Sequence, residues 1–226
     1  MSVLTATFFG LCLAGAFGVL SVREHRALRR SRWSLLDECK HILGGAEIRH
    51  GSDGFPRLLG SHCGNRVHLE LIPDTMVLRR LPQLWASLTL IDSLVGVPSL
   101  AILVRPAGYE FYSLTSSLSC ALDPPTSFPS EVLVRGSDAR AAQLLEQLSP
   151  QLATILADPR VKEIAVTNRG LRVISQVGEG RRGEHLLLRQ AVFDDASVQP
   201  NELAKRLEEL EGLWATLGRH EWKLAA

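Results

Sequence analysis

The first 22 residues contain no charged side chain, and the run from Val3 to Val22 is rich in leucine, alanine, phenylalanine and valine. As a helix rising about 1.5 Å per residue, this run would be roughly 30 Å long, which matches the hydrocarbon core of a bilayer. A cleaved signal peptide carries positive charge before a shorter apolar stretch, whereas only Met1 and Ser2 precede this run. We therefore predict an uncleaved transmembrane anchor over residues 1–22.

Five arginines follow this run directly: Arg23, Arg26, Arg29, Arg30 and Arg32. Because basic residues stay on the cytoplasmic side of a single span, we expect the N-terminus outside and the rest of the chain in the cytoplasm of a bacterium, at its inner membrane. Contact with anionic lipid head groups follows from the same placement, at about 1 kcal/mol per basic residue near the surface. Beyond position 32 the chain has 20 Lys and Arg against 23 Asp and Glu, which argues against nucleic acid as a partner.

Small residues recur every four positions inside the run, at Gly10, Ala14 and Gly18. This spacing predicts a face on which a second transmembrane helix could pack. The alternative is that glycine is simply common in membrane-spanning helices.

The cysteines are too scattered to predict a disulfide framework, and this favours a reducing compartment. Cys39 and His41 are two positions apart, and His62 is followed directly by Cys63. Neither spacing is typical of a zinc site, and neighbouring residues of a strand point to opposite faces. No metal site is therefore predicted.

After the anchor we expect a basic juxtamembrane segment with a short helix over residues 23–45 and a cytoplasmic domain over 46–226. Short apolar or alternating runs, such as that around Val67, predict strands. The apolar stretch 84–104 contains Asp92, whose charge would be costly in a bilayer, so we interpret it as two buried strands joined by a turn. Sequential hairpins followed by two C-terminal helices indicate an α+β fold with a largely antiparallel sheet.

The last helix, opened by Pro200, carries a regular apolar face. Docking on the protein's own sheet is one interpretation of this face. The other is a partner-binding surface that, together with an aromatic residue in the tail, comprises Leu203, Leu207, Leu210, Trp214, Leu217 and Trp222.

Two stretches resemble uncharacterised bacterial proteins that have one membrane helix and a cytoplasmic α+β domain. One is the Gly-x-x-x-Gly-x-x-Val strand opening of Gly60, Gly64 and Val67, and the other is the strand–helix–hairpin unit of residues 132–176. The resemblance implies a sheet crossed by a helix, as in pleckstrin-homology domains, and it carries over no catalytic residue.

The chain has no glycine-rich phosphate loop and no nucleophile-elbow serine, so we predict no catalytic residue and no cofactor. The leading hypothesis is a non-enzymatic accessory subunit or assembly factor that binds an integral membrane protein complex. A membrane-surface module for anionic lipid or a lipidic ligand is the second hypothesis, and an enzyme of unrecognised type is the third.

Overall fold

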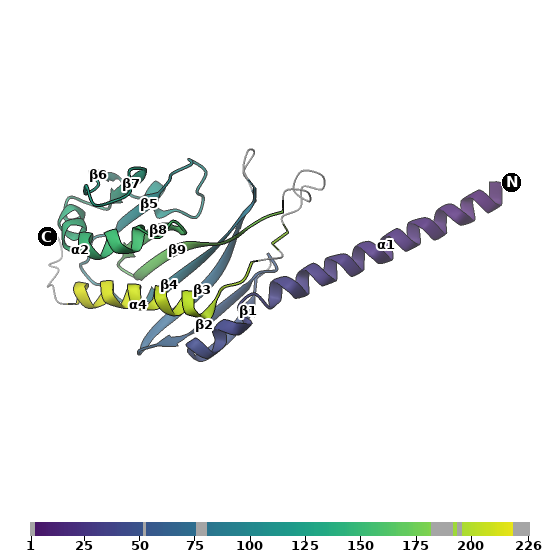
Figure 1. Ribbon diagram of the computed structural model, residues 1–226, viewed down its shortest axis with the longest axis horizontal. Helices are drawn as coiled ribbons and strands as arrows, with labels where there is room; N and C mark the ends of the chain where they lie inside the picture. Colours follow the sequence, from purple (N-terminus) through teal and green to yellow (C-terminus); the bar gives the residue numbers. More distant parts are fainter. Residues whose placement is uncertain (1–2, 52, 76–80, 182–191, 194–195, 219–226) are drawn as a thin grey trace.

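The N-terminal helix α1 (Val3–Trp33) projects away from the rest of the molecule in this computed structural model (Figure 1). The structure describes residues 3–51, 53–75, 81–181, 192–193 and 196–218. Within α1, the side chains at several positions also lie outside the described residues: 3–7, 9–12, 14, 21, 24–25 and 28. Every described side chain of α1 from Phe8 to Arg30 is exposed to solvent.

The predicted anchor is not confirmed by the structure. In the described part of the chain, no helix combines the length and the hydropathy that crossing a bilayer requires. Two of the three small residues proposed to pack in the membrane, Gly10 and Ala14, have side-chain positions outside the described residues, whereas Gly18 is exposed. The helix itself does not end at residue 22, because α1 continues without a break to Trp33.

A short 3-10 helix, η1 (Asp37–Ile42), connects α1 to the domain. Leu36 and Cys39 are fully buried there, and Leu43 follows them into the core. The chain then enters the first strand, so residues 36–43 belong to the folded domain, whereas residues 23–33 lie on α1.

Within the described residues, the sheet has nine strands in the order β1-β2-β3-β4-β9-β8-β5-β7-β6, and each strand pair is antiparallel. This confirms the predicted α+β class with a large antiparallel sheet, while the single continuous sheet leaves the pleckstrin-homology-like arrangement without support. The strands are β1 (Gly44–His50), β2 (Pro56–His62), β3 (Asn65–Asp74), β4 (Gln83–Ile91), β5 (Leu100–Val104), β6 (Cys120–Leu122), β7 (Val132–Gly136), β8 (Val161–Thr167) and β9 (Gly170–Glu179).

The stretch 84–104 does form two buried strands, β4 and β5, but they are not neighbours. The β8–β9 hairpin lies between them, with β9 paired to β4 and β8 paired to β5. Pairs of consecutive strands therefore join β1 to β4, β6 to β7 and β8 to β9, but the pairing of β4 with β9 joins residues 79 to 96 positions apart.

Two helices, α2 (Arg140–Leu156) and α4 (Pro200–Leu217), contribute buried faces to the main core, and α4 crosses the sheet in Figure 1. Apolar residues at helical spacing face the strands because this period places them on one side of a helix. The leucines among them that are at most 2% exposed are Leu144, Leu148, Leu152, Leu156, Leu203, Leu207, Leu210, Leu213 and Leu217.

The partner-binding interpretation of α4 needs correction. Four of its predicted contact residues belong to the protein's own core: Leu203, Leu207, Leu210 and Leu217. Trp214 packs against that core, and its indole Nε1 donates a hydrogen bond to Asp92 at 2.6 Å. Trp222 lies outside the described residues. Docking on the sheet, the alternative reading of this face, accounts for its apolar pattern.

We expect Leu207→Ala to lower the free energy of unfolding by about 2–5 kcal/mol, since it removes a fully buried side chain and leaves a cavity. Glu208→Ala, at the exposed neighbouring position, is the control and should change that energy by less than about 0.5 kcal/mol. Urea unfolding of both variants in mild detergent measures the difference. Equal stabilities would contradict the docking of α4.

Candidate functional site

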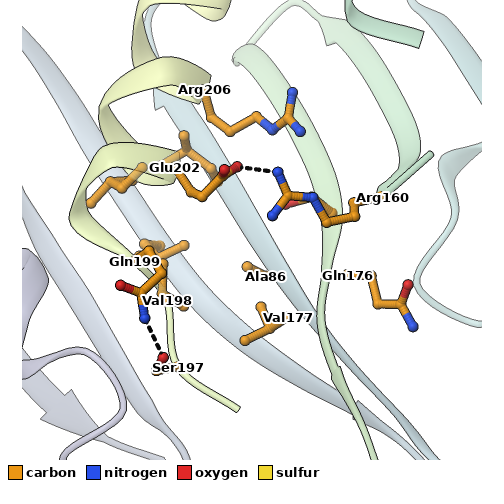
Figure 2. Close-up of a pocket in the computed structure, with 13 residues that line it drawn as sticks. Ala86, Arg160, Gln176, Val177, Ser197, Val198, Gln199, Glu202 and Arg206 are labelled. Atoms are coloured by element: carbon orange, nitrogen blue, oxygen red, sulfur yellow. Dashed lines mark hydrogen bonds and ion pairs between the residues drawn. The ribbon is translucent and has the colours of Figure 1, made fainter. Parts of the chain in front are cut away.

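A cavity of about 100 Å³ lies between the sheet and the N-terminal end of α4 (Figure 2). Strands β3, β4 and β9, the segment before α4 and its first turns all contribute to the lining. The apolar part of the lining consists of Leu69, Ala86, Leu88, Val177, Val198 and Leu203. The polar part consists of Arg160, Ser175, Gln176, Ser197, Gln199, Glu202 and Arg206.

Ion pairs connect the charged residues around this cavity. Arg160 Nη2 lies 2.7 Å from Glu202 Oε2, as Figure 2 shows, and Arg206 Nη1 lies 2.7 Å from Glu209 Oε2. Arg206 also pairs with Asp158, whose carboxylate lies 3.4 Å from Lys205 Nζ. These three cations and three carboxylates compensate one another, so the charges at the cavity hold α4 in place and do not form a bare anion site.

Asp158 is the centre of this network because it follows the end of α2 and faces α4. Its side chain is only 11% exposed. Burial alone would raise the pKa of Asp158. The backbone N–H of Arg160 and the guanidinium of Arg206 donate hydrogen bonds to its carboxylate, and these bonds and the positive charges of both arginines lower this pKa. The result is a pKa well below the usual range for aspartate, so the carboxylate is ionised at neutral pH.

The cavity is also connected to the base of α1. Val198, which lines it, accepts a hydrogen bond from the buried Cys39 thiol of η1 at 3.2 Å. Burial, with a smaller contribution from the charge of Glu38, raises the pKa of Cys39 to about 11, so this thiol remains protonated and can donate. This hydrogen bond joins η1 to the wall of the cavity.

The five arginines after the apolar run do not share one environment. Arg23, Arg26, Arg29 and Arg30 are exposed. The Arg32 guanidinium instead lies 5.0 Å from the ring centre of Phe55, and burial lowers its pKa. Four of the five are thus exposed on α1, whereas Arg32 helps to join α1 to the domain.

The other face of the sheet carries two buried ion pairs, both starting from β8. Lys162 Nζ lies 2.8 Å from Glu110, and Glu163 lies 2.8 Å from Arg172 Nη2. A β-bulge between positions 161 and 163 interrupts the strand's alternation here. Both pairs hold the loop that follows β5. Glu110 belongs to this loop, and Glu163 also accepts a hydrogen bond from the backbone N–H of Leu114. We assign them a structural role.

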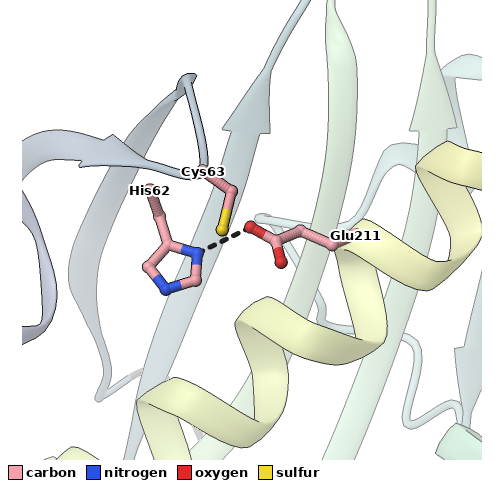
Figure 3. A group of neighbouring side chains, drawn as sticks. All are labelled: His62, Cys63 and Glu211. Carbon is pink, nitrogen blue, oxygen red and sulfur yellow. Dashed lines mark hydrogen bonds and ion pairs between the residues drawn. The ribbon is translucent and has the colours of Figure 1, made fainter.

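A third cluster joins the β2–β3 turn to α4, and Figure 3 shows its three side chains converging. His62 Nδ1 lies 2.6 Å from Glu211 Oε1, and Cys63 stands beside them. The expectation that His62 and Cys63 point to opposite faces is wrong, because Cys63 has left the strand and adopts a positive φ of 47° in the turn. The argument against metal ligands at these two positions therefore does not hold.

Sequence reasoning missed Asp158, Arg206 and Glu211 as members of these clusters. Asp158 has a local signal, because Asp–Pro–Arg predicts a turn whose carboxylate accepts the arginine N–H. Arg206 lies next to Leu207, a residue of the apolar face of α4, and this position indicates that its side chain is buried. No local pattern pairs Glu211 with His62, because 149 positions separate them.

No protein family model matches the chain, and no curated protein matches it either. One solved structure that it resembles is the crystal structure of the mycobacterial trehalose monomycolate transport factor A, TtfA. The match covers 86% of this chain and 94% of that chain, with 9% sequence identity and a TM-score of 0.39. Similarity at this level supports no inference from TtfA to this chain.

The lowered pKa of Asp158 predicts a pH-dependent stability. Its contribution to the free energy of unfolding is fully present above the ordinary aspartate pKa of about 4, and it is lost as pH falls below that value towards the folded-state pKa. Asp158→Asn should lower the stability at pH 7 by about 1.5–3 kcal/mol and should flatten its decline between pH 4 and pH 2. Urea unfolding at several pH values measures both effects.

The exposed Asp123→Asn in the loop after β6 is the matched control, and it should follow the wild-type pH profile. An Asp158→Asn profile parallel to that of the wild type would show that this carboxylate does not carry the effect.

Proposed function

We propose that this chain is a non-enzymatic accessory protein of a bacterial inner-membrane complex. In this proposal α1 is anchored in the bilayer, and the α+β domain binds or stabilises a partner on the cytoplasmic side. The single observation that carries the proposal is the apolar surface of α1, which the domain does not cover.

The described side chains of α1 give this surface its chemistry. Phe8, Leu13, Phe17, Val19 and Leu20 are each more than half exposed. Large apolar side chains gathered on one exposed helix are unusual in water, and they favour a lipid or protein environment. Together with the uncharged run of the sequence, they support a helix that resides in a membrane.

The charges beside this surface support the proposed orientation. Arg23, Arg26, Arg29 and Arg30 are exposed on the same helix, directly after the apolar part. Arginines in this position favour retention of that end in the cytoplasm and contact with anionic head groups. The three polar clusters of the domain are ion pairs or hydrogen-bonded groups at its joints, which supports a binding role over a catalytic one.

The anchor is tested with the double variant Leu13→Lys, Phe17→Lys. Each lysine at the centre of a span costs about 2.5–3.5 kcal/mol, so we expect the variant to leave the membrane fraction during alkaline carbonate extraction while the wild type stays. Ala27→Lys lies on the same helix beyond the apolar run and should behave as the wild type does. Immunoblots of pellet and supernatant give the retained fraction.

Release of the wild type by carbonate or by high salt would contradict the anchor. The same wild-type membranes, solubilised in mild detergent at native expression levels, test the accessory role. Co-purification of an integral membrane protein is expected, whereas a monodisperse monomer with no retained partner would contradict this part of the proposal.

The cavity beside α4 favours a second candidate function, the binding of a lipidic ligand. Its volume of about 100 Å³ is smaller than the roughly 150 Å³ of engineered apolar cavities that hold benzene. It therefore suits the end of an acyl chain, whose polar part would leave past Arg160 and Glu202. The contact of Val198 with Cys39 would connect such a ligand to the base of α1.

Ala86→Leu tests this second function by filling the cavity from β4. Because the cavity leaves space for the larger side chain, we expect the free energy of unfolding to fall by less than the roughly 1–3 kcal/mol that overpacking costs in a tight core. Binding of a fluorescent fatty-acid analogue, measured by fluorescence titration, should weaken at least about tenfold. Ala121→Leu, at an exposed position of β6, should leave both measurements unchanged. Equal binding by all three proteins would exclude the cavity as the site.

A further inference from the structure

We propose that His62, Cys63 and Glu211 form a binding site for a divalent metal ion of the zinc class. The site would join the tip of the β2–β3 hairpin to α4. One candidate ligand atom from each residue, an imidazole nitrogen, a thiol sulfur and a carboxylate oxygen, lies within 4.8 Å of the other two.

The hairpin turn aims the cysteine at this point. His62, the last residue of β2, pairs with Asn65, the first residue of β3, which leaves Cys63 and Gly64 as a two-residue turn. Both have positive φ, 47° and 85°, as a type I′ turn requires. Asparagine and glycine fit the first of these positions well, whereas cysteine is strained there. The turn brings the sulfur to the side on which His62 meets α4, as Figure 3 shows.

The ligand set matches the chemistry of zinc. Zinc binds imidazole nitrogen, thiolate sulfur and carboxylate oxygen at about 2.0–2.3 Å, so ligand atoms around a tetrahedral ion lie roughly 3.3–3.6 Å apart. Side-chain rotations alone would bring the Cys63 sulfur closer and open the 2.6 Å contact between His62 and Glu211. Three protein ligands leave the fourth position to water, which is the arrangement of zinc sites that exchange or activate a ligand.

A simple ion pair explains less of this geometry. Hydrogen bonding between His62 and Glu211 accounts for two of the three side chains, but it gives no reason for a thiol beside them. A divalent cation between the three side chains would be bound by all of them, including Cys63, whose sulfur lies within 4.8 Å of the ligand atoms of the other two residues.

The proposed site is separate from the cavity and from α1. Glu211 lies nine residues beyond Glu202, which is roughly 13 Å along α4. The two places share β3 and α4, but none of the three proposed ligands belongs to the lining of the cavity. Metal binding would fasten the β2–β3 hairpin to α4 without contact with the membrane anchor or the lipidic-ligand cavity.

Titration of the full-length chain with Co²⁺ in mild detergent tests the proposal, because a cobalt–thiolate bond gives a near-ultraviolet charge-transfer band. We expect one equivalent of Co²⁺ to produce the band and Zn²⁺ to displace it. Cys63→Ser should abolish the band and weaken Zn²⁺ binding at least about 100-fold, more than the loss of an outer-shell partner does. Glu211→Gln should weaken Zn²⁺ binding at least about tenfold.

Cys120→Ser is the matched control and should retain both the band and the affinity. Thermal unfolding gives a second readout: Zn²⁺ should raise the midpoint of the wild type and of Cys120→Ser, but not that of Cys63→Ser or Glu211→Gln. A band that persists in Cys63→Ser, or the absence of any band in the wild type, would overturn the proposal. Equal midpoints with and without Zn²⁺ in all four proteins would leave only an ion pair between His62 and Glu211 and would overturn it as well.

Discussion

The antiparallel pairing of β4 with β9 is the interaction on which the rest of the structure depends. It joins residues 83–91 to residues 170–179 and inserts the β8–β9 hairpin between two strands that are consecutive in the chain. With β9 in the centre of the sheet, Leu88 and Val173 form one apolar surface on which α4 packs. The cavity at the N-terminal end of α4 and the position of Glu211 beside the β2–β3 turn both follow from this docking.

Polar contacts then fix where α4 lies on that surface. Arg206 pairs with Asp158 near the start of the helix, and Trp214 donates a hydrogen bond to Asp92 near its end. The buried leucines supply most of the favourable free energy, because apolar burial dominates folding and a buried ion pair contributes little beyond its own desolvation. The polar contacts instead select one position of the helix, and the Cys39–Val198 hydrogen bond extends this arrangement to the base of α1.

Local pattern was sufficient for the fold class but not for the sheet order. The alternation of Val67, Leu69 and Leu71 and the helical spacing of the leucines in α4 predict a strand and a helix, and both are present. The neighbour of β4 depends on long-range pairing, for which a single sequence carries no signal. The site residues were harder to predict. Cys63 lies in a turn and does not follow the strand alternation that was assumed for it. The burial of Lys162 and Glu163 depends on a β-bulge and on a loop that is distant in the sequence.

The central claim is that α1 holds this domain at the cytoplasmic face of a membrane, and the exposed thiol of Cys63 offers a direct test. A membrane-impermeant maleimide would be applied together with a metal chelator, which frees the thiol of any bound ion, to intact cells and to washed inverted vesicles, with Cys63→Ser measuring the labelling of the other cysteines. The account predicts Cys63 labelling in inverted vesicles and none in intact cells until the membrane is permeabilised. Labelling of Cys63 in intact cells, or loss of the protein from the washed vesicles, would contradict it.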